Sequence, residues 1–135
     1  PQAVFTGDTL FNAGVGNCHN GGDPEALYQT VSQQLAQLPG NVRVYPGHEY
    51  MGNNLGFTLD REPGNTDAKN LLQVYRQLDN EKDFLVTDLN QEKKINTFLR
   101  LDSKNVRQHL PEEKPPEEYT DKEVFLSLRD LRNRW

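Results

Sequence analysis

The apolar positions in the first fifty residues predict a strand, a loop, a helix and a second strand, in that order. The run Ala-Val-Phe-Thr lies within residues 1–8 and is typical of a buried strand. Residues 9–22 are rich in Gly and Asn and predict a loop. Residues 42–45 alternate between apolar and polar side chains, which predicts a short strand. Between the loop and this strand, apolar residues recur at helical spacing at Leu27, Val31, Leu35 and Leu38.

Residues that begin and end helices flank this predicted helix. Asp23 can accept a hydrogen bond from the first backbone N–H groups, and Pro24 suits the first helical position. The pair Pro39–Gly40 ends the helix, because proline lacks an N–H group and glycine adopts the backbone conformations of a C-terminal cap. We therefore expect a helix that begins at Pro24 and ends just before Pro39.

After Tyr50 the chain changes to helical patterns. Residues 51–61 predict a short helix that ends before Pro63. Asn65 or Thr66 is the expected N-cap of the next helix. The apolar positions of that helix are Leu71, Leu72, Tyr75 and Leu78.

Two further helices are expected beyond these. Thr87 is a candidate cap for one of them, with Ile95, Phe98 and Leu99 as its apolar positions. Residues 111–118 combine charge with proline and predict a solvated linker. The stretch Thr-Asp-Lys-Glu at 120–123 is a capping box, in which two side chains bond to each other's backbone N–H groups. It opens a last helix whose apolar positions are Val124, Phe125, Leu128, Leu131 and Trp135.

Composition narrows the class of protein. Of the 135 residues, 33 are Leu, Ile, Val or Phe, which is enough for a folded core. Only one of these is Ile, so we expect few strands and much helix. The formal net charge of −5 argues against a nucleic-acid partner. No apolar run approaches the ~18 residues of a membrane span, so we expect no membrane partner.

Cysteine use and the first residue give two further expectations. Cys18 is the only cysteine, so an intrachain disulfide is impossible, and we expect a reducing compartment such as the cytoplasm. The sequence starts with Pro1 in the middle of a strand pattern and without Met. This suggests a fragment, a processed chain or a trimmed product.

Two residues that can bind a metal follow the two predicted strands. Asp8 comes directly after the first strand, although Gly7–Asp8 is also a common turn dipeptide. His48 follows the second strand and Gly47, where a lone histidine is also typical of a cap or a surface residue. If the strands are neighbours, the carboxylate and the imidazole converge, and zinc accepts both ligand types. Two ligands do not complete a zinc site, and the sequence has no His-x-His motif and no second cysteine.

Several short motifs follow one another as in a known family. They are VFTGDTLFNAGVGNC, LPGNVRVYPGHEY, NN, EPGN, FLR and VRQH. Together they resemble the C-terminal half of glyoxalase II, the hydroxyacylglutathione hydrolase family of the metallo-β-lactamase superfamily. The resemblance extends over almost the whole chain. Each motif is weak alone, but the Gly-Asp-Thr-Leu-Phe and Gly-His-Glu-Tyr motifs are specific in this order and at this separation.

The resemblance implies an α+β fold and a metal-dependent activity. Residues 1–50 would be the C-terminal part of an αββα sandwich, and residues 51–135 would be an all-helical, substrate-binding domain. The family hydrolyses S-D-lactoylglutathione to glutathione and D-lactate through a metal-bound hydroxide. It uses two metal ions, zinc or alternatively iron or manganese.

Five residues match functional positions of the family. Asp8 matches the aspartate that bridges the two metals, and His48 matches a histidine ligand of the second metal. Tyr50 matches a tyrosine that lies against glutathione. Arg129 and Arg132 match a basic pair that binds the glutathione carboxylates, with Arg132 in place of a lysine; guanidinium groups suit that task. A solvated helix face is the alternative interpretation of the two arginines.

Three neighbouring residues depart from the family pattern. Asn17 stands where the family usually has a lysine, which removes a positive charge from the glutathione site. His19 stands where a tyrosine is usual and can replace its hydrogen bond. Cys18 is interpreted as a small filler rather than a nucleophile, because the family attacks with hydroxide.

The family's His-x-His-x-Asp-His motif does not occur in this sequence. Because Asp8 and His48 cannot close a two-metal site, we expect this chain alone to hold metal weakly or not at all and to lack thioesterase activity. One alternative is another hydrolase or a persulfide dioxygenase that acts on a different thiol derivative. The other is a non-catalytic remnant that self-associates, or pairs with a missing N-terminal half, through the apolar face at Val4, Phe5, Val42 and Val44.

Overall fold

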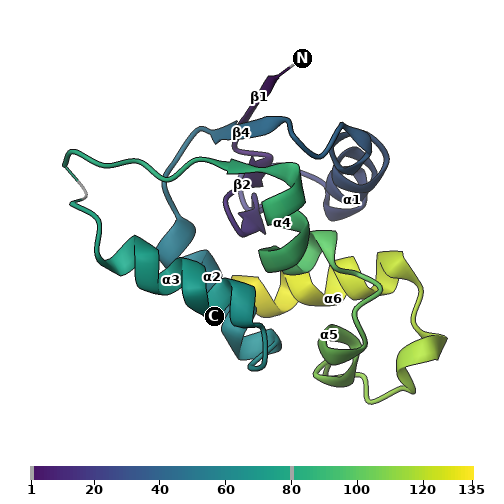
Figure 1. Ribbon diagram of the computed structural model, residues 1–135. Coiled ribbons are helices and arrows are strands. Elements are labelled where there is room, and N and C mark those ends of the chain that lie inside the picture. The colour runs from purple at the N-terminus through teal and green to yellow at the C-terminus, as the bar shows by residue number, and fades with distance from the viewer. Residues whose placement is uncertain (1, 80) are drawn as a thin grey trace.

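Helices dominate the molecule, and a small sheet lies along its upper edge in Figure 1. The computed structural model describes residues 2–79 and 81–135. The mixture of helix with a few short strands confirms the expected α+β class. Within the described ranges, every helix is too short or too polar to pass through a bilayer.

A three-stranded sheet joins early and late parts of the chain. Strand β1 (Ala3–Gly7) pairs in parallel with β4 (Arg43–Pro46), so both predicted strands are confirmed. Pro1, which the predicted first strand includes, lies outside the described residues. The other edge of β4 pairs antiparallel with β5 (Thr87–Asp88), a strand that the sequence pattern does not predict. Val44 is the centre of this sheet, opposite Val4 in β1 and Thr87 in β5.

The segment 9–22, predicted to be a loop, contains a β-hairpin. Strands β2 (Leu10–Phe11) and β3 (Gly14–Val15) pair antiparallel, and residues 10–16 are all buried. The turn between them places Ala13 in the left-handed region, with φ 60°. The prediction was wrong here because each strand has only two residues, too few to show an alternating pattern.

The first helix begins as predicted and ends early. Helix α1 (Pro24–Gln33) is capped by Asp23, whose side chain accepts a hydrogen bond from the Glu25 N–H group. A 3₁₀ turn, η1 (Leu35–Gln37), follows in place of the last predicted helical turn. Val31 of α1 is fully buried in the core, and Leu27 and Tyr28 pack against the same core with partly buried side chains.

Two predicted helices after residue 50 are confirmed. Helix α2 (Met51–Arg61) has the predicted bounds. Helix α3 (Thr66–Arg76) is capped by Asn65, whose side chain accepts a hydrogen bond from Ala68 N. Asn65, rather than Thr66, is therefore the N-cap.

Helix α4 (Leu89–Ile95) begins one residue later than a Thr87 cap would imply. Its cap is Asp88, which forms a capping box with Gln91. The hydroxyl of Thr87 is buried instead and donates to the carboxylate of Glu92. Thr87 was the wrong choice because its side chain points into the core.

Shorter elements fill the region before the last helix. A 3₁₀ turn, η2 (Thr97–Leu99), follows α4, and helix α5 (Lys104–Gln108) was not predicted. The predicted linker 111–118 ends in a 3₁₀ turn, η3 (Pro116–Glu118). Helix α6 (Asp121–Asn133) has the predicted capping box between Thr120 and Glu123.

One apolar core is shared by the sheet, the hairpin and the helices. Helix α6 runs below α4 and reaches the α2–α3 pair at its end (Figure 1). The core takes residues from both sides of position 50, among them Leu10, Val31, Val44, Phe57, Leu89, Phe98, Phe125 and Leu128. The division into segments 1–50 and 51–135 stays a prediction, and the two segments are packed against each other.

The expected exposed apolar face is only partly present. Val42 and Val44 are buried in the shared core, because the side of the sheet that carries them is covered by helices of the same chain. Val4 is partly buried against that core. Phe5 is 81% exposed and stacks on Tyr45, with ring centroids 5.4 Å apart. The sequence interpretation was wrong for Val42 and Val44.

A buried ion pair ties the end of α2 to the segment after η2. Glu62, which is 2% exposed, accepts hydrogen bonds from Arg100 Nε at 2.7 Å and Arg100 Nη2 at 3.0 Å. Ser103 Oγ donates to the same carboxylate at 3.0 Å. This carboxylate therefore fixes the turn that leads into α5.

Replacing Glu62 by Gln should lower the free energy of unfolding by about 2 kcal/mol, because it leaves the Arg100 guanidinium without its counter-charge. The control is Asp60→Asn, which removes a more exposed pair with Arg61 and should cost less than about 1 kcal/mol. Urea denaturation at pH 7 measures both. Equal losses in the two variants would contradict the assigned role of Glu62.

Candidate functional site

The parallel pairing of β1 and β4 brings Asp8 and His48 together. Parallel strands end at the same edge of a sheet, and here each of the two strands leads into a turn at a glycine. Gly7 adopts φ 52°, and Gly47 N donates to Gly7 O at 2.7 Å. His48 Nδ1 then lies 2.8 Å from Asp8 Oδ1, so the predicted convergence is confirmed. Their side chains are 54% and 71% exposed, so an ion can reach both.

The donor types of this pair fit part of a metal shell. Carboxylate oxygen and imidazole nitrogen suit zinc, iron and manganese alike. Across residues 2–79 and 81–135, no cluster of three or more His, Cys, Asp or Glu side chains is suitable for a metal ion. A zinc ion usually takes at least three protein ligands. Asp8 and His48 therefore suit a site to which other residues contribute.

A pocket of about 410 Å³ opens beside this pair, and we call it the Asp8 pocket. Tyr50 forms one wall, with its ring stacked on His48 at 5.3 Å and edge-on to Phe11 at 4.9 Å. The stacking fixes the plane of the imidazole ring. The residues that line the pocket are Asp8, Phe11, Gly16, Asn17, Asn20, Gly22, His48 and Tyr50.

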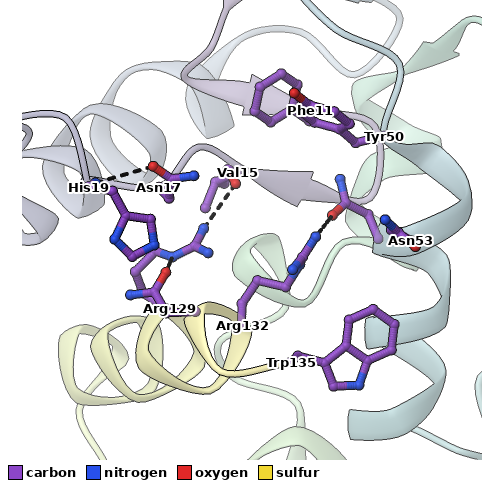
Figure 2. Close-up of a pocket in the computed structure, with 11 residues that line it drawn as sticks. Phe11, Val15, Asn17, His19, Tyr50, Asn53, Arg129, Arg132 and Trp135 are labelled. Atoms are coloured by element: carbon purple, nitrogen blue, oxygen red, sulfur yellow. Dashed lines mark hydrogen bonds between the residues drawn. The ribbon is translucent and has the colours of Figure 1, made fainter.

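A second pocket, of about 260 Å³, adjoins the first, and we call it the Arg132 pocket. Phe11, Asn17 and Tyr50 line both pockets, so these side chains form a shared wall. Arg132 extends from α6 into this pocket, with Trp135 below it (Figure 2), and Asn54 also lines it. The other lining residues are Val15, His19, Asn53, Arg129 and Asn133.

The Arg129 side chain mainly stabilises the hairpin through hydrogen bonds. It is 5% exposed, and its Nη1 donates to Val15 O at 3.0 Å and Gly16 O at 2.8 Å. Its guanidinium also lies over the ring of Phe98 at 5.6 Å. Burial, together with the charge of Arg132, lowers the pKa of Arg129 to about 10, which still leaves it charged at neutral pH. The side chain therefore holds the C-terminal end of β3 in place.

Arg132 is the more accessible cation of the pair. Its Nη2 lies 3.4 Å from Asn54 Oδ1, a long and weak hydrogen bond. Its guanidinium lies over the indole of Trp135 at 5.4 Å. Partial burial lowers the pKa of Arg132. A weakly held guanidinium at a pocket wall is suited to bind an anionic group.

The three residues that depart from the family pattern have different positions. Asn17 is exposed on the wall between the pockets, and its Oδ1 accepts from His19 N at 3.2 Å. His19 is exposed and lines the Arg132 pocket. Cys18 is partly buried against Gly22 and lines neither pocket. This position agrees with the interpretation of Cys18 as a filler.

Sequence reasoning missed several residues of these pockets. Phe11 and Asn53 were not candidates, and Trp135 was expected in the core but is 51% exposed and lines the Arg132 pocket. Asn54 is buried and donates to Asn12 O at 3.1 Å, which ties α2 to the hairpin. The Asn53–Asn54 pair close behind the Gly-His-Glu-Tyr motif was the available signal.

Comparison with known proteins agrees with the resemblance. A family described as "Hydroxyacylglutathione hydrolase C-terminus" matches residues 49–135. A hydroxyacylglutathione hydrolase of Nitrosococcus oceani is 58% identical over 137 residues, covering 100% of this chain and 52% of that protein. A protein of the same name from a Polaromonas species is 55% identical over 135 residues, covering 98% and 51%. The chain spans about half the length of the curated relatives it matches.

Arg129 and Arg132 should affect stability differently. Arg129→Met leaves two buried carbonyl groups without a donor and should lower the free energy of unfolding by about 3 kcal/mol. Arg132→Met removes a partly exposed side chain with one long hydrogen bond and should cost less than about 1 kcal/mol. Urea denaturation of both variants checks this. A larger loss for Arg132→Met would show that the roles are reversed.

Proposed function

The chain belongs to the hydroxyacylglutathione hydrolase family, and on that premise we propose that it is the C-terminal part of a metal-dependent hydrolase of glutathione thioesters. The supporting observation is the shared wall between the two pockets. Asp8 and His48 stand on one side of Phe11 and Tyr50, and Arg132 stands on the other. A thioester whose anionic arm lies near Arg132 would present its carbonyl carbon toward Asp8 and His48.

Asp8 and His48 would hold metal in the complete enzyme. The ion, which we propose to be zinc with iron or manganese as alternatives, supplies a Lewis acid and a water of lowered pKa. The remaining metal ligands would come from residues that correspond to the half of the relatives that this chain does not span. Tyr50 keeps the His48 ring in place by stacking, which holds its coordinating nitrogen in one direction.

Arg132 would bind a carboxylate of glutathione, with Arg129 contributing positive charge from below. Guanidinium groups stay protonated near pH 7, so the positive charge that these two side chains contribute is constant there. Asn17 and His19 would contact the peptide part of the substrate through hydrogen bonds. Tyr50, on the shared wall, would lie against the same part of the ligand.

The preferred substrate is S-D-lactoylglutathione, and we place the reaction in the cytoplasm, where the thiols of glutathione and Cys18 stay reduced. Asn17 favours the alternative, which is a hydrolase or persulfide dioxygenase for another thiol derivative. The family usually has a lysine at this position, so Asn17 leaves the site with one cation fewer than is usual in the family. The exposed ring of Phe5 is what supports a self-associating remnant.

The chain alone should not hydrolyse S-D-lactoylglutathione, because two ligands cannot hold and activate a metal-bound water. The assay follows thiol release with added zinc. The control is a full-length protein that includes this chain, which should release glutathione. Zinc-dependent turnover by residues 1–135 alone would contradict the proposed division of the metal site.

In the full-length protein, Arg132→Ala should raise KM about tenfold and change kcat less than about threefold, because the lost contact is made equally in substrate and transition state. Arg134→Ala is the matched control, since Arg134 is an exposed cation on the same helix end, paired with Asp130. Steady-state kinetics should show no change for Arg134→Ala. Equal effects of the two variants would mean that general charge, not the pocket, attracts the substrate.

A further inference from the structure

A buried carboxylate lies beneath the tip of the β2–β3 hairpin. Glu92, on α4, has 0% exposure. Its Oε1 accepts hydrogen bonds from Ala13 N at 2.8 Å and from Asn96 Nδ2 at 3.1 Å. Its Oε2 accepts a hydrogen bond from Thr87 Oγ1 at 2.7 Å. Three donors from three parts of the chain are thus directed at one carboxylate.

The same polar network holds the rest of the hairpin tip. Asn12 Nδ2 donates to Thr87 Oγ1 at 2.9 Å, and Asn96 Nδ2 also donates to Gly14 O at 3.1 Å. Ala13 has φ 60°, a conformation that costs a non-glycine residue about 1–2 kcal/mol. Because β2 and β3 have two residues each, their own pairing is too short to maintain this turn. The contacts from outside the hairpin therefore determine its shape.

Both arms of the hairpin lead directly into the two pockets. Phe11, on the first arm, belongs to the shared wall, and Asn17 follows the second arm on the same wall. Gly16 N donates to Thr9 O at 3.0 Å, and Gly16 packs against the backbone of Asp8 so closely that a side chain would not fit. A displacement of the tip would therefore change both pocket walls and the support of Asp8.

We propose that Glu92 is a positioning residue for the Asp8 and Arg132 pockets, acting through the β2–β3 hairpin. The inference rests on the proposed function for what the pockets bind. Glu92 does not touch a substrate or a metal in this arrangement; it determines where Phe11 and Asn17 stand.

The electrostatic setting of Glu92 makes the arrangement sensitive to pH. Burial raises the pKa of Glu92 to about 7, and the nearby charge of Asp88 acts in the same direction, while the hydrogen bonds from Thr87, Ala13 and Asn96 act against it. Within the described ranges, no cation forms an ion pair with Glu92. Since the folded pKa is above the unfolded value, stability should fall as pH rises from about 4.5 to about 7.

The first experiment is an NMR pH titration of the ¹⁵N-labelled chain. Ala13 N–H donates to the carboxylate, so its amide shift should titrate with a midpoint near pH 7, and the amides of Gly16 and Asn17 should contain a component with the same midpoint. Glu92→Gln should abolish that component at all three amides. Any titration that remains in Glu92→Gln belongs to groups other than Glu92.

Two outcomes of the titration would overturn the inference. One is an Ala13 amide that titrates with Glu92 while Gly16 and Asn17 do not follow, which would confine the effect of Glu92 to the tip. The other is a titration of Ala13 that persists in Glu92→Gln. Both outcomes can be tested with the wild-type chain and Glu92→Gln alone. Gln has nearly the same shape as Glu, so the test does not depend on a larger substitution that prevents folding.

The second experiment measures binding of S-methylglutathione by calorimetry, with folding confirmed by circular dichroism. Glu92→Leu should weaken binding about tenfold, and Glu92→Gln, which keeps an acceptor for Ala13, by less than about threefold. Glu62→Gln is the control, because Glu62 is an equally buried carboxylate away from the hairpin. The affinity of this variant for S-methylglutathione should equal that of the wild type. Equal weakening by the Glu62 and Glu92 variants would reduce Glu92 to a general stabilising role. If the wild-type chain does not bind S-methylglutathione, the proposed glutathione site fails, and the NMR titration still decides the role of Glu92.

Discussion

The parallel pairing of β1 with β4 is the constraint on which the site depends. Two parallel strands require a crossover, which α1 and η1 supply, and their C-terminal ends then lie at one edge of the sheet. Asp8 and His48 are separated by 40 positions in the sequence, yet their side chains meet because the pairing fixes the register Val4–Val44. A shift of the register by one residue would turn the side chains of one strand to the opposite face.

Buried charges distinguish structural from functional roles in this chain. Arg129 and Glu62 are almost fully buried, and their hydrogen bonds go to carbonyl groups or to an ion-pair partner of the same chain. Arg132, Asp8 and His48 are partly or well exposed and have few or weak internal contacts. Because a buried charge is costly unless it is paired or hydrogen-bonded, the exposed groups are the ones free to change partners. This explains how an acidic chain keeps a basic pocket.

Local signals in the sequence were sufficient for much of the fold. Asp23 and Thr120 act on backbone groups within three residues, so their capping roles could be read directly. The convergence of Asp8 with His48 could also be predicted, because it needs only two strands and their order. The hairpin could not be predicted, because a contact between Ala13 at its tip and Glu92 helps to hold it. These residues are 79 positions apart, and no local sequence signal reveals the contact. For the same reason Thr87 was taken for a cap, although its hydroxyl serves this distant network.

The site forms where early and late segments of the chain close on each other. Arg129 reaches Val15 across 114 positions, Asn96 reaches Gly14 across 82, and β5 completes the sheet begun by β1. Contacts of such separation close long loops at a cost in entropy, which burial of the shared core around Phe98 and Phe125 offsets. The pocket walls are therefore a product of the complete core. It follows that the helices after residue 50 shape the Asp8 edge as well as the Arg132 pocket, even though they contribute neither Asp8 nor His48.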